Sequence, residues 1–219
     1  MVVDFDPQAN ATSALGIDPR SVEKSMYDVI LNDVNLRDCI IKSKWEFLSV
    51  APSNLDLAGA EIELVSAFNR ERLLDGAISS VISEFDFVLI DCPPSIGLLT
   101  VNALTAASEV LVPIQCEYLA LEGLGQLLSN VERVKTHLNK ELHISTIALV
   151  MFDARTKLAG QVVEEIRSHF GERVCQQTVP RSVRLSEAPS YGQPIIYYDS
   201  SSRGAIAYRS LAKEITGGA

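Results

Sequence analysis

The sequence predicts an α/β protein whose mostly parallel, twisted sheet is covered by helices on both faces. Apolar runs of strand length alternate with helical patterns along the whole chain, as in βαβ units. Several of these runs are apolar almost without interruption, which is expected of strands buried on both faces. The 219 residues are 47% hydrophobic and 21% charged, a composition ordinary for a globular protein able to bury a sizeable core.

The expected elements follow one another in order. Strands are predicted over 1–5 (MVVDF), 45–50 (WEFLSV), 85–90 (FDFVLI), 110–114 (VLVPI) and 144–151 (ISTIALVM). Helical patterns lie over 58–69, 71–83, 98–107, 119–138, 157–170 and 204–215. Because the chain contains neither an internal repeat nor a low-complexity linker, we expect a single domain over residues 1–219.

Charge is distributed unevenly along the chain. The formal net charge is −9; residues 1–150 carry 10 Lys and Arg against 21 Asp and Glu, whereas residues 151–219 carry 9 against 7. The acidic excess therefore lies in the first two thirds, and the composition of the last third permits a local basic face.

The cysteines and histidines are too scattered for a metal site or a disulfide framework. The four cysteines form no CxxC motif, a pattern that favours a reducing cytosol. No run approaches the roughly 20 apolar residues of a membrane span, and the first residues lack the basic region of a secretory signal. We therefore expect a cytoplasmic protein.

Two of the predicted strands end in aspartate. Asp4 and Asp6 close the first strand, and Asp91 follows FDFVLI. Ligands of open α/β sheets bind at the carboxyl ends of the strands. The segment FDFVLIDCPPS has the form of a Walker B motif, in which Asp91 would hold Mg²⁺ through water. The alternative is that these aspartates cap turns or helices.

The segment VVDFDPQANATSALG resembles the strand and switch loop that follow the phosphate-binding helix in ParA/Soj partitioning ATPases, which are relatives of MinD. Residues 151–166 and 179–215 resemble later parts of the same family, so the resemblance covers nearly the whole chain. It implies a P-loop NTPase-like fold and the cofactors ATP and Mg²⁺. It also implies a homodimer, non-specific double-stranded DNA and a ParB-like protein as partners, and association with the nucleoid.

The resemblance implies three roles at the switch loop. Asp6 would orient and polarise the attacking water, Asp4 would support the magnesium end of the site, and Asn10 would contact the γ-phosphate region. Phosphoryl transfer depends mainly on positioning and charge neutralisation, which such groups can supply.

The resemblance also implies two groups of residues in the last third. DNA contacts would be made by Arg155 and Arg184, with Arg203 as a weaker candidate. The nucleotide base would lie near Met151, Phe152, Pro180 and Arg181. For any one of these arginines, the alternative is a solvated surface residue or a local ion pair.

One motif of the family is not found in these 219 residues. The family's KGGxGKT loop lies upstream of the DFDPQ strand, and a search for G-x-x-x-x-G-K-[ST] finds no match; Gly123 and Gly125 lie in a helical context without lysine. We expect the chain to be N-terminally truncated relative to the family, through a shortened gene model or a truncated sequence. The alternative is a degenerate relative without nucleotide binding. Without the strand before that loop, two edges of a buried sheet would be left open.

Three functions follow from these observations. The leading one is an ATPase that segregates a chromosome or plasmid, with hydrolysis stimulated by a ParB-like partner. The second is a ParA-like binding module without nucleotide, so the missing loop leaves the enzymatic activity of this chain open. The third is a ParA-like ATPase that positions a protein cargo. A membrane-bound version is disfavoured, because the last segment, AYRSLAKEITGGA, is short and weakly basic.

Overall fold

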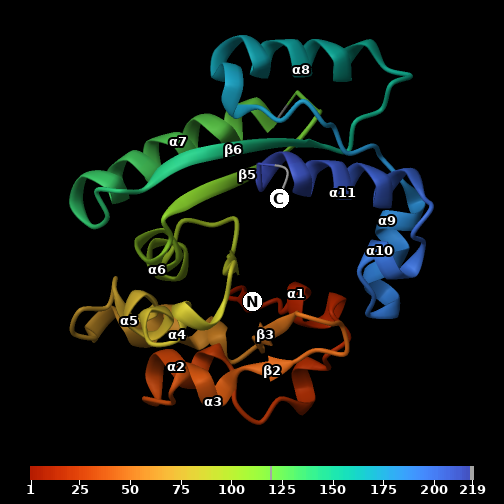
Figure 1. Cartoon of the computed structure of the whole chain (residues 1–219). Coiled ribbons are helices and arrows are strands. Elements are labelled where there is room, and N and C mark those ends of the chain that lie inside the picture. The colour runs from red at the N-terminus through yellow and green to blue at the C-terminus, as the bar shows by residue number, and fades with distance from the viewer. Residues whose placement is uncertain (119, 218–219) are drawn as a thin grey trace. The chain divides into compact units, whose positions relative to one another are not determined.

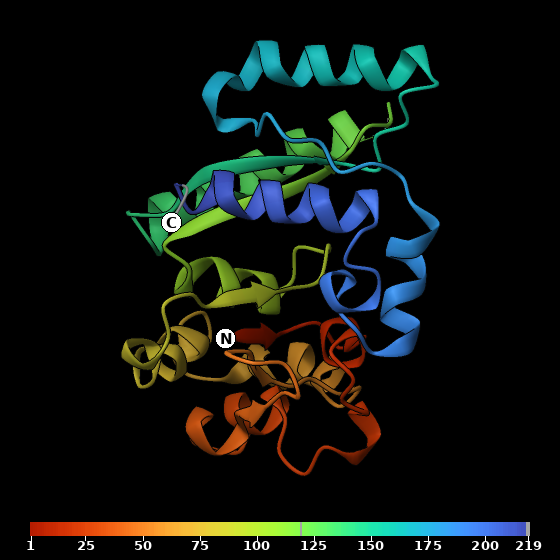
Figure 2. The ribbon, with the colours of Figure 1, turned by 45° about the vertical axis from the view of Figure 1, so that its right-hand side comes forward.

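The computed structural model describes residues 1–118 and 120–217 (Figures 1 and 2). The chain divides into two compact units, Met1–Ser108 with Val134–Lys140, and Glu109–Arg133 with Glu141–Ala219. Both units combine parallel strands with helices, which confirms the α/β class. The single domain over residues 1–219 stays a prediction.

The first unit is built on a four-stranded sheet in the order β2-β3-β1-β4. Its strands are β1 (Val2–Asp4), β2 (Ile41–Lys42), β3 (Ser49–Ala51) and β4 (Leu89–Asp91). β1 pairs in parallel with β3 and with β4, and β2 is antiparallel to β3. The register places Asp4 opposite Asp91, so the carboxyl ends of β1 and β4 lie side by side.

All three predicted strands of this unit are shorter than the sequence predicted, and the strand expected over 1–5 is reduced to Val2–Asp4. The segment 45–50 becomes extended only at Ser49, because the chain turns at Trp45: the amide of Leu48 donates to the carbonyl oxygen of Trp45 at 3.2 Å, and Phe47 has a left-handed φ of 59°. Likewise, only Leu89–Asp91 of the apolar run after residue 85 joins the ladder. Apolar character alone did not separate strand from turn in these segments.

Short helices surround this sheet. They are α1 (Asn10–Ala14), α2 (Met26–Leu31), α3 (Leu36–Cys39), α4 (Leu57–Glu63), α5 (Leu73–Ser79) and α6 (Leu98–Ala106), with 3-10 turns at Pro19–Ser21, Leu64–Ser66 and Ile82–Glu84. The predicted helices over 58–69 and 71–83 therefore end early, each followed by a 3-10 turn. The first three helices were not predicted, because four to six residues are too few to show a helical period.

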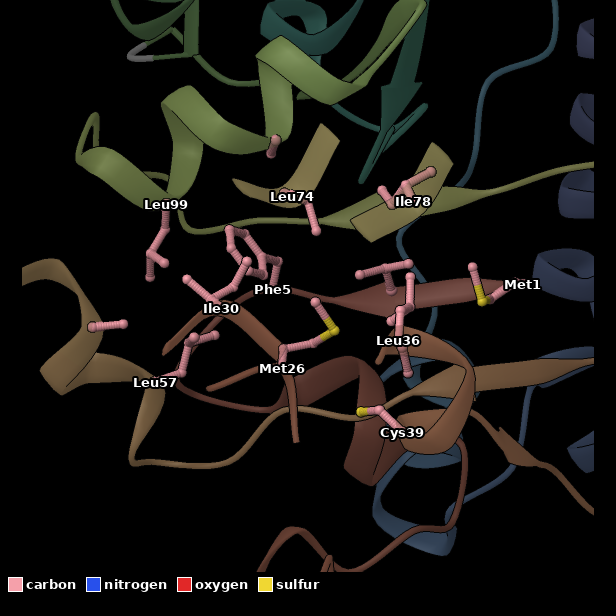
Figure 3. Packing of buried hydrophobic residues seen from close by; sticks show 14 of the residues in the cluster. Met1, Phe5, Met26, Ile30, Leu36, Cys39, Leu57, Leu74, Ile78 and Leu99 are labelled. Carbon is pink, nitrogen blue, oxygen red and sulfur yellow. The ribbon is translucent and has the colours of Figure 1, made fainter. Parts of the chain in front are cut away.

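The core of the first unit lies between the sheet and these helices (Figure 3). Phe5 after β1, Met26 of α2, Leu57 of α4, Leu74 of α5 and Leu99 of α6 are all fully buried. Burying a side chain of this size contributes about 1.5–3 kcal/mol. The same core thus anchors the strand ends that carry the aspartates.

The second unit contains the parallel pair β5 (Glu109–Gln115) and β6 (His143–Val150), with an irregularity between Val110 and Leu111. Its helices are most of α7 (Ala120–His137), α8 (Lys157–Phe170), α9 (Val183–Glu187), α10 (Ile195–Tyr198) and α11 (Arg203–Ile215), with 3-10 turns at Gly171–Arg173 and Ala188–Tyr191. The helix predicted over 157–170 has the predicted bounds. The helix predicted over 119–138 corresponds to α7, and residue 119 lies outside the described residues.

Helix α11 runs along the β5–β6 pair in both views (Figures 1 and 2). Ser202 caps its N-terminus, and the Ser202 hydroxyl accepts a hydrogen bond from the amide of Ala205 at 3.2 Å. Its buried face places Ala207 and Leu211 in a cluster with Ala148 of β6. Within the part of the chain that the structure describes, no helix has the length and apolar character needed to cross a membrane.

Each sheet ends in an apolar strand with one unpaired edge. Among the described strands, β4 pairs only with β1, and β5 pairs only with β6. Leu89 of β4 is 59% exposed and Leu111 of β5 is 40% exposed, although uninterrupted apolar strands are typical of sheet interiors.

Candidate functional site

Three aspartates lie at the carboxyl ends of β1 and β4. Asp4 is opposite Asp91, and the amide of Phe5 donates to the carbonyl oxygen of Asp91 at 2.7 Å, which extends the pairing by one residue. Asp6 follows at the start of the next loop. The structure therefore brings Asp4, Asp6 and Asp91 to one edge of the sheet, as the strand pattern predicted.

Asp4 is fully buried and fully engaged in hydrogen bonds. Its Oδ2 accepts from the amide of Thr12 at 2.7 Å and from the Thr12 hydroxyl at 2.6 Å, and its Oδ1 accepts from the amide of Asp6 at 3.3 Å. Burial raises the pKa of Asp4 above its usual value, although these hydrogen bonds act in the opposite direction. Asp4 thus holds the following loop against the sheet.

Asp91 lies at the exposed edge of β4. Among the described residues, none forms a hydrogen bond or an ion pair with its carboxyl group. Although the residue is exposed, the strand end shields part of its carboxyl group from water; this desolvation raises the pKa of Asp91, and the charges of Asp4 and Asp6 raise it further. A carboxylate crowded by like charges, with no cationic side chain beside it, is a candidate cation ligand.

The donor set at this edge suits magnesium. No group of three or more metal-ligating side chains occurs among the described residues. Mg²⁺ does not require one, because it binds through one or two carboxylates and completes its shell with water and phosphate oxygens. The small number of carboxylates at this edge is therefore compatible with the predicted role of Asp91, which stays a prediction.

Asp6 has one carboxyl oxygen in a turn. Its Oδ1 accepts from the amide of Gln8 at 2.9 Å, and its carbonyl oxygen accepts from the amide of Ala9 at 2.9 Å. Ala9 has a left-handed φ of 52°, which is uncommon for a residue with a side chain. Asn10, the first residue of α1, is exposed. Asp6 therefore caps a turn, which was the alternative role for this aspartate. Its second carboxyl oxygen, Oδ2, has no hydrogen-bond donor among the described residues.

The residues predicted near the base come together in the second unit. The amide of Phe152 donates to the carbonyl oxygen of Val179, and the amide of Arg181 donates to that of Phe152, each at 3.0 Å. Phe152 and Pro180 form an isolated parallel bridge, and Met151 has a left-handed φ of 56°. The end of β6 is therefore fastened to the segment that begins at Val179.

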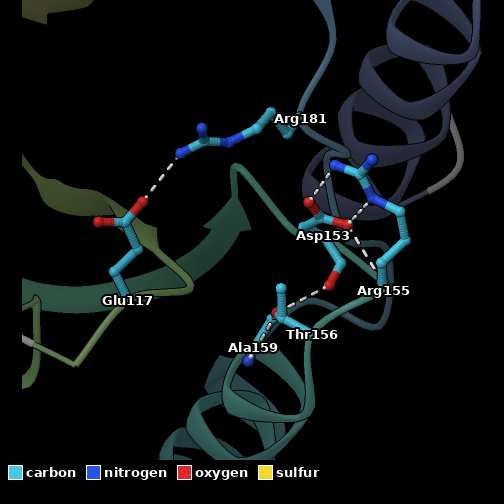
Figure 4. A network of polar contacts seen from close by, with 6 residues as sticks. All are labelled: Glu117, Asp153, Arg155, Thr156, Ala159 and Arg181. Carbon is cyan, nitrogen blue, oxygen red and sulfur yellow. Dashed lines mark hydrogen bonds and ion pairs between the residues drawn. The ribbon is translucent and has the colours of Figure 1, made fainter.

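The arginines beside this segment are paired with carboxylates (Figure 4). Arg155 makes a bidentate contact with Asp153, with Nε 2.9 Å from Oδ1 and Nη2 2.7 Å from Oδ2. This partner lowers the pKa of Asp153 well below its usual range. Arg181 Nη2 donates to Glu117 Oε1 at 2.9 Å.

Arg184 is paired in the same way. Its Nη1 is 3.1 Å from Glu187 Oε2, its Nε is 3.4 Å from Asp199 Oδ2, and its guanidinium lies 6.0 Å from the centre of the Tyr198 ring. Arg203 at the start of α11 is exposed, and no ion pair to it is found among the described residues. The two main candidate arginines therefore form the local ion pairs that were the alternative for them, although the sequence did not identify their acidic partners.

Two hollows are found among the described residues, and neither is lined by Asp4, Asp6 or Asp91. In the second unit a hollow of about 410 Å³ is lined by Ile114, Gln115 and Glu117, the carboxylate partner of Arg181. In the first unit a hollow of about 690 Å³ is lined by Met1, Ser49 and Phe87 among others, at the amino ends of the strands. Ligands of open α/β sheets bind at the opposite, carboxyl edge. The candidate site is therefore the edge that carries the aspartates.

Comparison with known proteins decides the family. A family model described as an AAA domain matches residues 1–144. The sporulation initiation inhibitor protein Soj of Bacillus subtilis (strain 168) is 52% identical over 215 residues, which are 98% of this chain and 85% of that protein. The chromosome partitioning protein ParA of Myxococcus xanthus is 48% identical over 215 residues, 98% of this chain and 76% of that protein. The chain belongs to the ParA/Soj family of chromosome-partitioning ATPases.

Solved structures agree with the predicted fold. A cobyrinic acid a,c-diamide synthase from Mycobacterium smegmatis, with bound ADP and magnesium, has a TM-score of 0.83 at 35% identity, covering 100% of this chain and 83% of that one. The cell division ATPase MinD of Pyrococcus furiosus has a TM-score of 0.80 at 25% identity, covering 100% and 86%. The predicted family and P-loop NTPase-like fold are confirmed. The roles of individual residues stay predictions.

Proposed function

We propose that this ParA/Soj family member is a DNA-segregation ATPase. It binds ATP with Mg²⁺, dimerises, binds double-stranded DNA without sequence preference, and hydrolyses ATP when a ParB-like partner stimulates it. The observation that carries the proposal is the acidic edge of the first unit, where Asp4 and Asp91 are in register and Asp6 opens the adjoining loop. This edge combines a candidate ion ligand with a candidate water-positioning group.

The residues present fit the magnesium end and the hydrolytic end of such a site. Asp91 would hold the ion, which when bound supplies positive charge to the phosphate oxygens. Asp6 would use its free Oδ2 to accept a hydrogen bond from the attacking water, while its Oδ1 stays in the turn with Gln8. The lysine and the backbone amides that cradle phosphates in P-loop proteins are not among these 219 residues.

The DNA-binding part of the proposal rests on Arg155 and Arg184. The Arg155 side chain is 86% exposed and its guanidinium is held by one carboxylate. A phosphate can replace such a carboxylate, because both accept the same paired N–H donors. Affinity gained in this way comes from counterion release and carries no sequence preference.

The test compares Asp6→Ala with Asp91→Ala in a loop-bearing form, a protein in which residues 1–219 follow the phosphate-binding loop of a ParA/Soj relative. Asp6→Ala should bind ATP and dimerise, while turnover falls 10²–10⁴-fold, the usual contribution of a group that positions or activates the water. Asp91→Ala should weaken the Mg²⁺-dependent binding itself. ATPase assays, calorimetry and a size measurement separate the two.

Near-normal turnover in Asp6→Ala would refute its role in hydrolysis. Intact Mg²⁺-dependent binding in Asp91→Ala would leave Asp91 a structural residue. If the unsubstituted loop-bearing form binds no ATP, the ATPase proposal fails as a whole.

A further inference from the structure

The hydroxyl of Thr12 bridges two strands of the first unit. It donates to Asp4 Oδ2 at 2.6 Å, and it accepts a hydrogen bond from the amide of Ser53 at 3.0 Å. Asp4 ends β1, and Ser53 lies in the loop after β3. All three residues are buried. One side-chain oxygen thus joins the loop after β1 to the loop after β3.

The segment between Asp6 and Ala14 has few other attachments. Among the described residues, its hydrogen bonds to parts of the first unit other than residues 15–17, which directly follow it, all involve Asp4 or Thr12. Its remaining hydrogen bonds are local, such as those from the amides of Gln8 and Ala9 to Asp6. The left-handed backbone at Ala9 also needs support from its surroundings. The position of this segment therefore depends on the Thr12 bridge.

The loop after β3 is itself firmly held. The amide of Met26 donates to the carbonyl oxygen of Pro52 at 2.9 Å, and the Ser25 hydroxyl donates to Asn54 Oδ1 at 3.3 Å. Ser53 is fully buried. Thr12 is consequently attached on one side to the buried carboxyl group of Asp4 and on the other side to the backbone amide of Ser53.

We propose that Thr12 is a positioning residue, whose hydroxyl fixes the loop that carries Asp6 and Asn10 relative to Asp91. The proposal rests on the proposed function, since it assumes that this loop acts on the attacking water. A displacement of about 1 Å in such a group can cost about 10²-fold in rate. The hydroxyl matters rather than the bulk of the side chain, because a valine of the same shape cannot donate to Asp4 or accept from Ser53.

The first experiment uses the 219-residue chain and needs no nucleotide. Thr12→Val should raise the hydrogen-exchange rates of the Ser53 amide and of the amides of residues 8–13 about tenfold, because a buried donor and acceptor lose their partner. Thr12→Ser, which keeps the hydroxyl, should stay within about threefold of the wild-type rates. Amides of β5 and β6 should not change.

Thr105→Val is the matched control. Thr105 is also buried, and its hydroxyl donates to the carbonyl oxygen of Val101 at 2.7 Å inside α6, away from the loop. The Thr105→Val variant should leave the hydrogen-exchange rates of the amides of residues 8–13 and of Ser53 unchanged. If Thr12→Val does not fold, the comparison moves to Thr12→Ser and Thr12→Ala, where only the first should protect these amides. Equal exchange in Thr12→Val and wild type would overturn the proposal.

The second experiment uses the loop-bearing form. Thr12→Val should lower kcat about tenfold with KM nearly unchanged, Thr12→Ser should restore kcat, and Thr105→Val should change neither. If exchange rises in Thr12→Val but kcat does not fall, while Asp6→Ala still loses turnover, the bridge is structural and the positioning role is refuted. If Asp6→Ala also keeps its turnover, the proposed hydrolytic role of the loop is what fails.

Discussion

At the acidic edge of the first unit and beside the arginines of the second unit, an aspartate accepts hydrogen bonds of similar length. The pKa of the aspartate is raised in the first region and lowered in the second. Asp4 accepts bonds of 2.6 and 2.7 Å from Thr12, yet its pKa lies above the usual value because burial outweighs them. Asp153 accepts bonds of 2.7 and 2.9 Å from Arg155, and its pKa is strongly lowered because the donor carries a full positive charge at the surface.

The difference separates a region whose hydrogen bonds hold the backbone in place from one whose ion pairs can be exchanged for another partner. The contacts of Asp4 are neutral donors in a dry interior, where an unpaired partner is costly. The contacts of Arg155 and Arg184 are exposed ion pairs, which contribute little net free energy and are screened by salt. We therefore expect substitutions at the acidic edge to change stability, and substitutions at the arginines to change binding.

The largest effect is expected at the arginines. In the loop-bearing form with ATP, Arg155→Glu and Arg184→Glu should each reduce affinity for duplex DNA by about 10²-fold or more, because a dimer presents each arginine twice. Each lost phosphate contact should also lower the salt slope of log K by about 0.9. ATP-dependent dimerisation should persist. Salt titrations of DNA binding provide the measurement.

Arg20→Glu is the control for these variants. Arg20 is an exposed arginine in the acidic part of the chain, and the substitution changes the net charge by the same amount. It should have a much smaller effect on DNA binding. If both test variants keep the wild-type affinity and slope, the basic face lies elsewhere.

The next effect is expected at the buried aspartate. Asp4→Ala should lower the free energy of unfolding by about 3 kcal/mol, because it leaves the hydroxyl and amide of Thr12 and the amide of Asp6 without their acceptor. Asp18→Ala is a suitable comparison, since Asp18 is exposed and accepts its hydrogen bond in a surface turn. Urea denaturation of the 219-residue chain would measure both. If Asp4→Ala lowers the free energy of unfolding by less than about 1 kcal/mol, the buried hydrogen bonds of Asp4 contribute no more to stability than exposed ones.

Sequence reasoning succeeded where a pattern was long or where a strand ended in a charge. Helix α8 shows four turns of apolar periodicity, and its predicted bounds are those observed. The meeting of Asp4 and Asp91 followed from the rule that parallel strands present their carboxyl ends together. The three-residue length of β4 was not predictable, because Phe85 and Phe87 are as apolar as strand residues but lie outside the ladder.

The partners of polar side chains were the part that sequence could not supply. The bridge from Thr12 to Ser53 spans 41 positions and depends on the packing of β1 against β3. The pairing of Arg155 with Asp153 is local, but residues two positions apart do not face each other on a helix, and these two residues do not belong to a strand. It arises here because a loop turns between β6 and α8. A D-x-R spacing in a predicted loop is the signal that could have suggested it.

The smallest effect expected is a gain of DNA affinity. Arg155 cannot contact a phosphate with both donors while Asp153 holds them, so the carboxylate reduces the fraction of molecules ready to bind. In the loop-bearing form, Asp153→Asn should raise DNA affinity about threefold, because an exposed pair is only partly populated in water. Asparagine can still accept the hydrogen bond that the Arg155 amide donates to Asp153 Oδ1 at 3.0 Å, so the turn should be kept and the unfolding midpoint unchanged.

The control must separate the lost pair from the lost charge. Glu172→Gln removes one negative charge from an exposed position of the same unit and touches none of the candidate arginines. If competition by Asp153 is the cause, Asp153→Asn should exceed Glu172→Gln in affinity, and the gain should vanish in the Asp153→Asn/Arg155→Glu double variant. Equal gains in the two single variants would show that only net charge matters. In that case the bidentate pair has no influence on DNA binding, and the exchangeable character inferred for this region would be wrong.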